Sequence, residues 1–255
     1  MNKNKLYGAI LGDLAGQPYE FGYKGDYSEF NIHDSRSKFT DDTIMTLATA
    51  SVFLEKDIHQ IRQKEFEAAY KAFGLKYEGD YYGSKFKQWL RLPKETIGTS
   101  WGNGALMRVT PVYYAIQDPS RQLITALDSA FTSHFSPEVY TCMRRHQFYF
   151  HNVDAYDYPQ EVIKDMEIPR FDKFDSSSAG TMDFIGLIAR KCKTTHEAIE
   201  TCIRAGGDTD TNASIAGEIF SNFRKDLTQD DIDYVESKLD PFLFTILKKF
   251  NEKFK

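Results

Sequence analysis

Cysteine is scarce in this chain: among 255 residues there are only Cys142, Cys192 and Cys202. None of them stands in a Cys-x-x-Cys pair, and an odd number cannot pair completely within one chain. The sequence therefore favours neither a disulfide framework nor a cysteine-ligated zinc site. Such cysteine use is typical of a reducing compartment, and we expect a cytoplasmic protein.

The chain also lacks long apolar stretches and an excess of basic residues. No run approaches the roughly 18 apolar residues that span a bilayer, and the basic residues 1–5 do not lead into a secretory signal, because Asp13 and other polar residues interrupt the next stretch. The formal net charge is -5, which disfavours nucleic acid as a general partner. We expect no membrane partner, no general nucleic-acid binding, and a monomer as the default state.

Strand-like alternation of apolar and polar residues is scarce as well, whereas helical spacing recurs almost everywhere. Pro111 should kink one helix or delay its start, because proline lacks the amide hydrogen that a helix interior needs. Residues 152–178 carry prolines and serines and should form a loop-rich excursion. The sequence thus predicts an all-α fold with a single domain over residues 1–255. The predicted helical faces lie at residues 6–14, 44–52, 66–73, 106–113, 123–130, 184–188, 198–203, 213–220, 232–239 and 242–250.

Gly8, Gly12 and Gly16 recur every four positions and leave one face of the first predicted helix without side chains. A glycine inside a helix costs about 1 kcal/mol relative to alanine, so this face needs compensation. We expect close packing of another helix there, or close approach of a ligand. Gly16 precedes Gln17-Pro18, where we expect the helix to end.

Two short acidic segments stand directly ahead of apolar runs with helical spacing: residues 40–43 (Thr-Asp-Asp-Thr) and residues 208–211 (Asp-Thr-Asp-Thr). Neighbouring carboxylates repel one another unless a cation lies between them. Carboxylate and hydroxyl oxygens are the ligands that magnesium-type ions prefer. The alternatives are helix capping by Thr40 or Asp41 in the first segment and a calcium-binding turn in the second.

The second segment comes after two glycines at 206–207, which permit a tight turn. In an extended or turn conformation Asp208 and Asp210 would face one point, and Thr211 would open the next helix. If the two segments meet, they supply four carboxylates, and Glu20 is the natural fifth. Around two divalent ions such a site is nearly neutral and suits a hydroxyl-rich or anionic ligand.

Five motifs, in the same order along the chain, resemble those of the ADP-ribosylglycohydrolases, a family that includes the dinitrogenase reductase-activating glycohydrolases. Each motif alone is weak, but five in register over most of the chain form a specific match. The resemblance implies a single-domain, all-α orthogonal bundle of helices that holds two magnesium or manganese ions. The motifs are Gly12-Asp13-x-x-Gly16-x-Pro18-x-Glu20, Thr40-Asp41-Asp42-Thr43, Gly102-Asn103-Gly104-Ala105-Leu106-Met107-Arg108, Ser133-His134-x-x-Pro137 and Gly207-Asp208-Thr209-Asp210-Thr211-Asn212.

The resemblance also implies roles for single residues. Glu20 would lie beside the ions and help to activate water, with Asp41 and Asp208 as further catalytic residues. Trp101 would stack on adenine, with a buried core tryptophan as the alternative, and backbone amides of its loop would be available to the diphosphate. Arg108 would serve helix packing. The implied metal ligands are Thr40, Asp41, Asp42, Asp208, Asp210 and Thr211, and the implied substrate-binding residues are Ser100, Trp101, Gly102, Asn103 and His134.

The implied function is that of a metal-dependent hydrolase acting on an ADP-ribosylated protein. It would cleave the glycosidic bond between ADP-ribose and a side chain, arginine or serine, and release ADP-ribose. The segment between Glu20 and Thr40 would form a lid. Two alternatives stay open: a catalytically silent ADP-ribose-binding relative, and a hydrolase of ADP-ribosylated nucleic acid or small molecules. A prenyl-diphosphate synthase is disfavoured, because residues 41–45 lack the third acid of an Asp-Asp-x-x-Asp motif.

Overall fold

The computed structural model describes residues 4–20, 30–79, 81–154, 166–171 and 173–255. Within these ranges all regular structure is helical, apart from isolated bridges such as that between Thr99 and His134. This confirms the predicted all-α fold, whereas a single domain over residues 1–255 stays a prediction. None of the described helices is both long and apolar enough to cross a membrane. The helices are α1 (Tyr7–Gly16), the 3-10 helix η1 (Gln17–Tyr19), α2 (Asp41–Glu55), α3 (Gln63–Lys76), α4 (Ser84–Leu90), α5 (Gly104–Met107), α6 (Thr110–Ala115), α7 (Pro119–Ala130), α8 (Pro137–His151), α10 (Ser178–Lys191), α11 (Thr195–Ala205), α12 (Thr209–Arg224), α13 (Gln229–Lys238) and α14 (Pro241–Lys253).

Polar caps and prolines set where many of these helices begin. Asp118, Ser136 and Ser177 each accept a bond from a backbone amide in the first turn of α7, α8 and α10. Losing such a cap typically costs about 1 kcal/mol. Pro111 lies in the first turn of α6, so the predicted kink is a break between α5 and α6. Between α8 and α10 the described residues form no helix, as predicted, while 155–165 and 172 lie outside the described residues.

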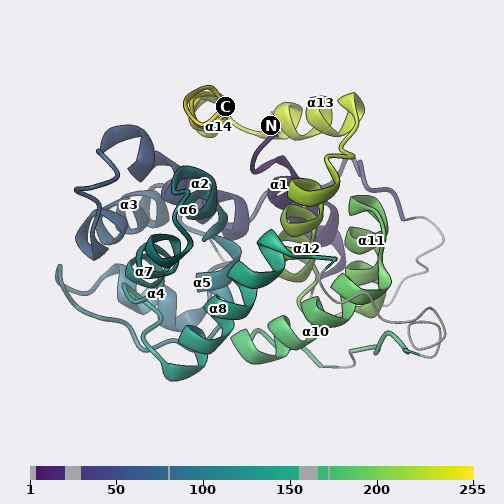
Figure 1. The fold of residues 1–255 in the computed structure, drawn as a ribbon, viewed down its shortest axis with the longest axis horizontal. Coiled ribbons are helices and arrows are strands. Elements are labelled where there is room, and N and C mark those ends of the chain that lie inside the picture. Colours follow the sequence, from purple (N-terminus) through teal and green to yellow (C-terminus); the bar gives the residue numbers. More distant parts are fainter. Residues whose placement is uncertain (1–3, 21–29, 80, 155–165, 172) are drawn as a thin grey trace.

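Helices α1 and α12 lie against each other near the centre of the molecule (Figure 1). The glycine face of α1 makes this contact. A Cβ atom on Gly12 would lie 2.1 Å from the carbonyl oxygen of Ala213, and one on Gly16 would lie 2.4 Å from that of Thr209. Only glycine permits such an approach of two helix backbones. Of the two expected ways to offset the helix-destabilising effect of these glycines, the structure shows close helix packing. Helix α1 ends at Gly16, as predicted.

A buried carboxylate also joins the two helices. Glu218 of α12 accepts bonds from the backbone amides of Leu6 and Ala9, at 3.0 and 2.8 Å, and from the Tyr114 hydroxyl at 2.6 Å. The first amides of a helix have no partner within it, and Leu6, the residue before α1, offers no side-chain cap. Glu218, a residue of α12, thus takes the place of the missing side-chain cap of α1. It also fixes the position of α1 along the axis of α12.

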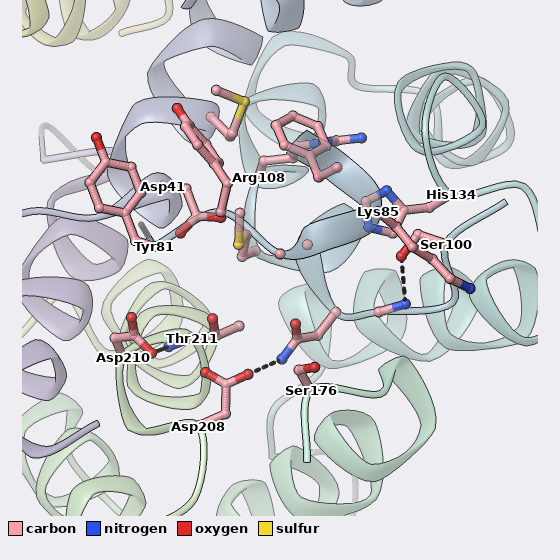
Figure 2. A pocket seen from close by; sticks show the side chains of 18 of the residues that line it. Asp41, Tyr81, Lys85, Ser100, Arg108, His134, Ser176, Asp208, Asp210 and Thr211 are labelled. Carbon is pink, nitrogen blue, oxygen red and sulfur yellow. Dashed lines mark hydrogen bonds between the residues drawn. The ribbon is translucent and has the colours of Figure 1, made fainter. Parts of the chain in front are cut away.

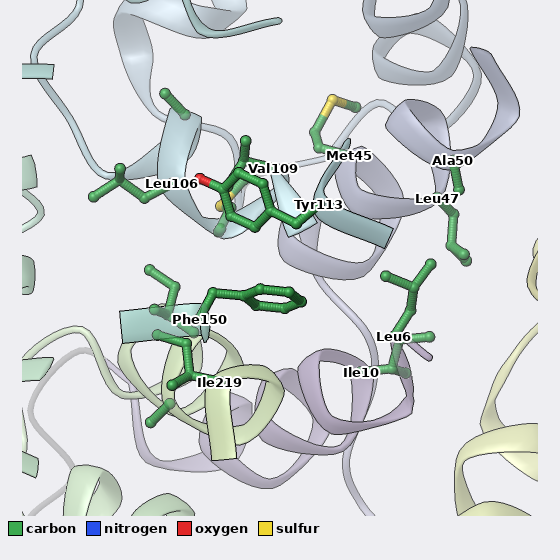
Figure 3. Packing of buried hydrophobic residues seen from close by; sticks show 14 of the residues in the cluster. Leu6, Ile10, Met45, Leu47, Ala50, Leu106, Val109, Tyr113, Phe150 and Ile219 are labelled. Atoms are coloured by element: carbon green, nitrogen blue, oxygen red, sulfur yellow. The ribbon is translucent and has the colours of Figure 1, made fainter. Parts of the chain in front are cut away.

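Apolar side chains fill the space around this helix pair. The buried cluster holds Leu6, just before α1, together with Ile10 of α1, Ile219 of α12 and residues of α2, α6 and α8 (Figure 3). Burying a side chain of this size contributes roughly 1.5–3 kcal/mol. The core therefore holds the beginnings of α2 and α12, where the two acidic segments lie, in a fixed relation.

Replacing Gly12 with alanine should lower the free energy of unfolding by about 3 kcal/mol, because the new Cβ would collide with the α12 backbone. Gly83→Ala is the matched control, since no heavy atom of the described residues, apart from Gly83 and its chain neighbours, lies within 4 Å of the position of its Cβ. That control should change stability by less than about 1 kcal/mol. Urea denaturation followed by far-UV circular dichroism measures both, and equal stability of the two variants would contradict the close contact.

Candidate metal and active site

The two acidic segments meet in the fold. The Thr211 hydroxyl, on α12, donates to Asp42 Oδ2, on α2, at 3.0 Å, although 169 positions separate them in the sequence. Asp42, Asp208 and Asp210 are buried. Figure 2 shows Asp41 on one side of a pocket and Asp208, Asp210 and Thr211 on the facing side. The two acidic segments, which were expected to contribute to one site, therefore do lie together in the fold.

Asp13 of α1 organises the first acidic segment. Its carboxylate accepts bonds from the backbone amides of Thr40 and Thr43, at 2.9 and 3.1 Å, and from their hydroxyls, at 2.8 and 2.5 Å. The Asp13 side chain has no exposure to solvent, so these donors replace the water that would otherwise stabilise its charge. Asp13 therefore fixes how the chain enters α2.

Thr40 caps α2, as the simpler alternative for this segment predicted. Its hydroxyl accepts a bond from the Asp42 amide at 3.3 Å while it donates to Asp13. Asp41 comes next, in the first turn, and lines the pocket. Capping therefore uses Thr40 only, and the two aspartates are left for another purpose.

Carboxylate oxygens gather in two overlapping groups, and within each group all three ligand atoms lie within 4.8 Å of one another. Asp13, Asp42 and Asp210 form one group, and Glu20, Asp208 and Asp210 form the other, so Asp210 belongs to both. Among the described residues, Asp42 Oδ1 is buried without a hydrogen-bond partner. A buried unpaired oxygen beside other carboxylates, in a donor set of hard oxygens, fits divalent cations of the magnesium or manganese type.

Burial and mutual repulsion disfavour negative charge in this cluster. Burial, followed by the charge of Asp13, raises the pKa of Asp41 and of Asp42 well above the ordinary range. Burial, followed by the charge of Asp208, does the same for the pKa of Asp210 and raises the pKa of Glu20 to about 8. A cation among these oxygens would favour the charged carboxylates and so lower their pKa values.

The start of α12 differs from its prediction. The helix begins at Thr209, two residues earlier than expected, so Asp208 precedes the helix and Asp210 lies in its first turn. Asp208 and Asp210 do face one point, as expected, with oxygens within 4.8 Å of each other, but Asp210 lies in the helix rather than in an extended or turn segment. The Thr209 hydroxyl donates to the Gly16 carbonyl at 2.9 Å and holds this first turn against the end of α1. The glycines at 206 and 207, with φ of +81° and +76°, make the preceding turn.

A pocket of about 410 Å³ lies where the segments meet (Figure 2). That volume is typical of small-molecule sites. One end carries the carboxylates, and the other carries Lys85, Ser100 and His134. Thr40 and Asp42 are buried and do not line it. The predicted residues that line the pocket are Glu20, Asp41, Ser100, Trp101, Gly102, Asn103, His134, Asp208, Asp210 and Thr211.

Trp101 is 51% exposed, so the alternative of a buried core tryptophan is wrong. Its ring lines the pocket, and Lys85 Nζ lies 5.7 Å from the ring centroid. The tryptophan of the core is Trp89 of α4, whose indole N–H donates to the Thr96 carbonyl at 2.7 Å. Trp101 therefore offers an aromatic face to a ligand at the end of the pocket away from the carboxylates.

The backbone amides of the 100–103 loop are already engaged. The Ser100 amide donates to the Ser133 carbonyl at 3.2 Å, and the Asn103 amide donates to the Ser176 carbonyl at 2.8 Å. The Gly102 amide donates to Ser100 Oγ at 3.2 Å. The expectation that these amides are available to a diphosphate is therefore wrong for these three. They brace the loop instead.

The Asn103 side chain supports the acidic cluster directly. Its amide nitrogen donates to Asp208 Oδ2 at 2.8 Å and to Thr181 Oγ1 at 3.0 Å. Asn103 is buried, so both bonds are shielded from water. The loop that presents Trp101 thereby also orients one carboxylate of the cluster.

His134 is buried. Burial, followed by the charge of Arg108, lowers its pKa well below the ordinary range. Arg108 is completely buried, with its guanidinium carbon 4.0 Å from the centroid of the Tyr70 ring, and it donates to Ser133 Oγ at 2.9 Å. Its predicted packing role agrees with these contacts.

Helix α4 and its side chains were not predicted from the sequence. Lys85 and Phe86 line the pocket, and Tyr81 and Tyr82 line it just before the helix. A signal was present, since Phe86, Trp89 and Leu90 have helical spacing after a glycine and a serine. A helix of seven residues gives only one such repeat, which is too short to stand out.

Residues 3–221 match the family model of the ADP-ribosylglycohydrolases. The chain belongs to the ADP-ribosylglycohydrolase family. A putative ADP-ribosyl glycohydrolase of Acanthamoeba polyphaga mimivirus is 26% identical, over 86% of this chain and 85% of that protein. A solved structure titled ADP-ribosylglycohydrolase-related protein complex shares the fold, with a TM-score of 0.68 and 18% identity, over 98% of this chain and 99% of that chain. Membership of the ADP-ribosylglycohydrolases confirms the sequence resemblance and supports a hydrolase that acts on ADP-ribosyl bonds.

The raised pKa values predict how cations stabilise this ADP-ribosylglycohydrolase. Carboxyl groups whose pKa is raised in the folded state stabilise the ion-free fold at low pH and lose that contribution as the pH rises. Mn²⁺ should therefore raise the melting temperature relative to EDTA, and by more at about pH 8 than at about pH 6, where protons compete for the oxygens. Because histidines titrate in both samples, their effect cancels in this difference. A difference that shrinks as the pH rises, or no effect of Mn²⁺ or Mg²⁺, would contradict an acidic cation site.

Proposed function

We propose that this chain is a metal-dependent hydrolase that cleaves the glycosidic bond between ADP-ribose and a protein side chain, arginine or serine, and releases ADP-ribose. The observation that carries the proposal is one pocket with a carboxylate cluster at one end and an aromatic and cationic end opposite. Two divalent cations at the first end would bind ribose hydroxyls, and the second end suits a base and a diphosphate. Family membership supports the same reaction.

Six residues would hold two Mg²⁺ or Mn²⁺ ions. Asp210, which belongs to both carboxylate groups, would be among the ligands that hold the ions. Asp13 would orient the first segment, because its oxygens already accept four bonds. When bound, the ions would supply positive charge that orients the ribose hydroxyls and polarises a water. The six residues are Thr40, Asp41, Asp42, Asp208, Asp210 and Thr211.

Glu20 would act as the general base. It is half-buried, lines the pocket and has an oxygen within 4.8 Å of oxygens of Asp208 and Asp210. From there it would accept the proton of a water that attacks the anomeric carbon. The bond to the acceptor would break through an oxocarbenium-like transition state, and the proton taken from the water would pass to the departing side chain. Asp41 and Asp208 would face the reacting ribose from opposite sides, with Asp208 held by Asn103.

His134 would donate a hydrogen bond into the pocket. In the tautomer that we propose, the Ser133 hydroxyl, which accepts from Arg108 at 2.9 Å, donates to His134 Nδ1, 2.8 Å away. An imidazole that accepts at Nδ1 carries its proton on Nε2. That nitrogen faces the 102–104 loop, where a Cβ on Gly104 would lie 3.2 Å from it. A neutral donor here suits a phosphate or ribose oxygen.

An assay panel tests the proposed activity and the linkage together. Arginine-, serine- and nucleic-acid-linked ADP-ribose would each be incubated with the protein in Mg²⁺ and in Mn²⁺, and released ADP-ribose measured. Asp208→Asn and Asp41→Asn should each lower the rate at least about a hundredfold. Asp183→Asn, which changes an exposed acid of α10 paired with Arg145, is the control and should keep full activity.

Three outcomes would count against the proposal. Full activity after EDTA treatment would remove the role of the metals. Binding of ADP-ribose without turnover of any linkage would favour a catalytically silent relative, and turnover of the nucleic-acid-linked substrate alone would move the acceptor away from proteins.

Trp101→Ala should raise KM for the substrate by about 5- to 100-fold and change kcat much less, because stacking on a base contributes about 1–3 kcal/mol and Trp101 lies away from the carboxylates. Trp101→Phe keeps an aromatic face and should recover most of the affinity. Phe223→Ala removes another exposed aromatic ring and serves as the control. A drop in kcat with an unchanged KM for Trp101→Ala would show that the ring does not bind the base.

A further inference from the structure

The described part of the segment between Glu20 and Thr40 does not cover the pocket. None of residues 30–39 lines it, and residues 21–29 lie outside the described residues. The expected lid is therefore wrong for residues 30–39. These residues lie instead against α13, near the C-terminal end of the chain.

Side chains of α13 hold this segment mainly through its backbone carbonyls. The Tyr234 hydroxyl donates to the Asp34 carbonyl at 2.8 Å, and Lys238 Nζ donates to the carbonyls of Ser35 and Ser37, at 2.7 and 3.0 Å. Ser37 is buried and lies three positions before Thr40. The bonds therefore act close to the first proposed metal ligand.

A carboxylate at the start of α13 ties the same segment to α11. Asp231 accepts from His33 Nε2 at 2.7 Å and from His196 Nε2 of α11 at 3.0 Å, and it also caps α13 through Thr228. The His33 ring lies 4.9 Å from the Tyr234 ring, centroid to centroid. Asp231 is buried, while His33 and His196 are partly exposed, and these bonds join three parts of the chain.

Helix α13 is also bonded to the helix that carries Asp13. The Tyr7 hydroxyl of α1 donates to Glu236 Oε1 at 2.6 Å. Three contacts thus form a closed circuit. Tyr7 links α1 to α13, Lys238 links α13 to Ser37, and Asp13 of α1 links back to Thr40. A closed circuit restricts the position of the 37–40 stretch more than either end alone, because fewer chain conformations remain open to it.

We infer that α13 positions the proposed metal-ligand segment, with Tyr234 and Lys238 as positioning residues that set where Thr40, Asp41 and Asp42 stand before an ion binds. The inference rests on the proposed function. It goes beyond the family match, because the matched residues end at 221 and α13 begins at Gln229.

The test is the double variant Tyr234→Phe/Lys238→Met, which removes three bonds to the segment and keeps both apolar bodies. In EDTA-treated, dialysed protein, the calorimetric Kd for Mn²⁺ should rise about tenfold, the lower end of what losing outer support of a metal site costs. Hydrogen–deuterium exchange should quicken at the amides of residues 37–43 and stay unchanged in the core of α12. Lys238→Arg in place of Lys238→Met should restore most of the affinity, because arginine keeps its donors.

Lys253→Met is the matched control, since Lys253 Nζ donates to the Phe53 carbonyl at 2.8 Å, near the other end of α2. It should leave the Mn²⁺ affinity unchanged. Wild-type affinity and exchange in the double variant would overturn the inference, as would an equal loss in the control. If the wild-type chain binds no Mn²⁺, the proposed metal site fails. Hydrogen exchange at residues 37–43 then tests the positioning role of α13 by itself. Faster exchange in the double variant supports that role, and unchanged exchange overturns it.

Discussion

The close contact of α1 with α12 is the constraint on which the site depends. Glycines on one face of α1 let the two backbones approach, and Glu218 fixes their relative position by capping α1 from α12. At the far end of this contact, Thr209 bonds to the Gly16 carbonyl. The beginning of α12 therefore lies beside the end of α1, so that Asp13 and Glu20 share one region with Asp208 and Asp210. A side chain in place of Gly12 would push these carboxylates apart.

The same packing makes the site electrically unusual. A core of apolar residues surrounds carboxylates that repel one another, and burial raises the pKa of each. A protein stabilises such a group only by protonating it, by donating hydrogen bonds to it or by supplying a cation. Asp13 has four donors and Asp208 has Asn103, whereas Asp42 Oδ1 has none among the described residues. The unpaired oxygen of Asp42 lies in the same carboxylate group as Asp13 and Asp210, and a cation among these oxygens would stabilise their charge.

Much of this arrangement can be predicted from local sequence signals. Helical spacing predicted most of the longer helices, although not α8. Pro111 predicted the break before α6, and the acidic residues ahead of two helices predicted an oxygen-rich site. Family motifs then named residues that do line one pocket. These signals work because caps, prolines and apolar faces act over a few positions.

Other features depend on partners that are distant in sequence. The backbone amides of the 100–103 loop are used up by Ser133 and Ser176, and the start of α12 is set by Gly16, so neither could be predicted from its own neighbourhood. Segment 30–39 is held by α13, some 200 positions away, and therefore does not act as the expected lid. Helix α4 gave too short a pattern.

The most direct test of the account is anomalous diffraction from crystals of this chain grown with Mn²⁺, because it locates each ion independently of any assay. Two ion peaks are expected, both bounded by side chains from the 40–42 and 208–211 segments. A single peak, a peak bound only by residues outside these segments, or no peak at saturating Mn²⁺ would contradict the account.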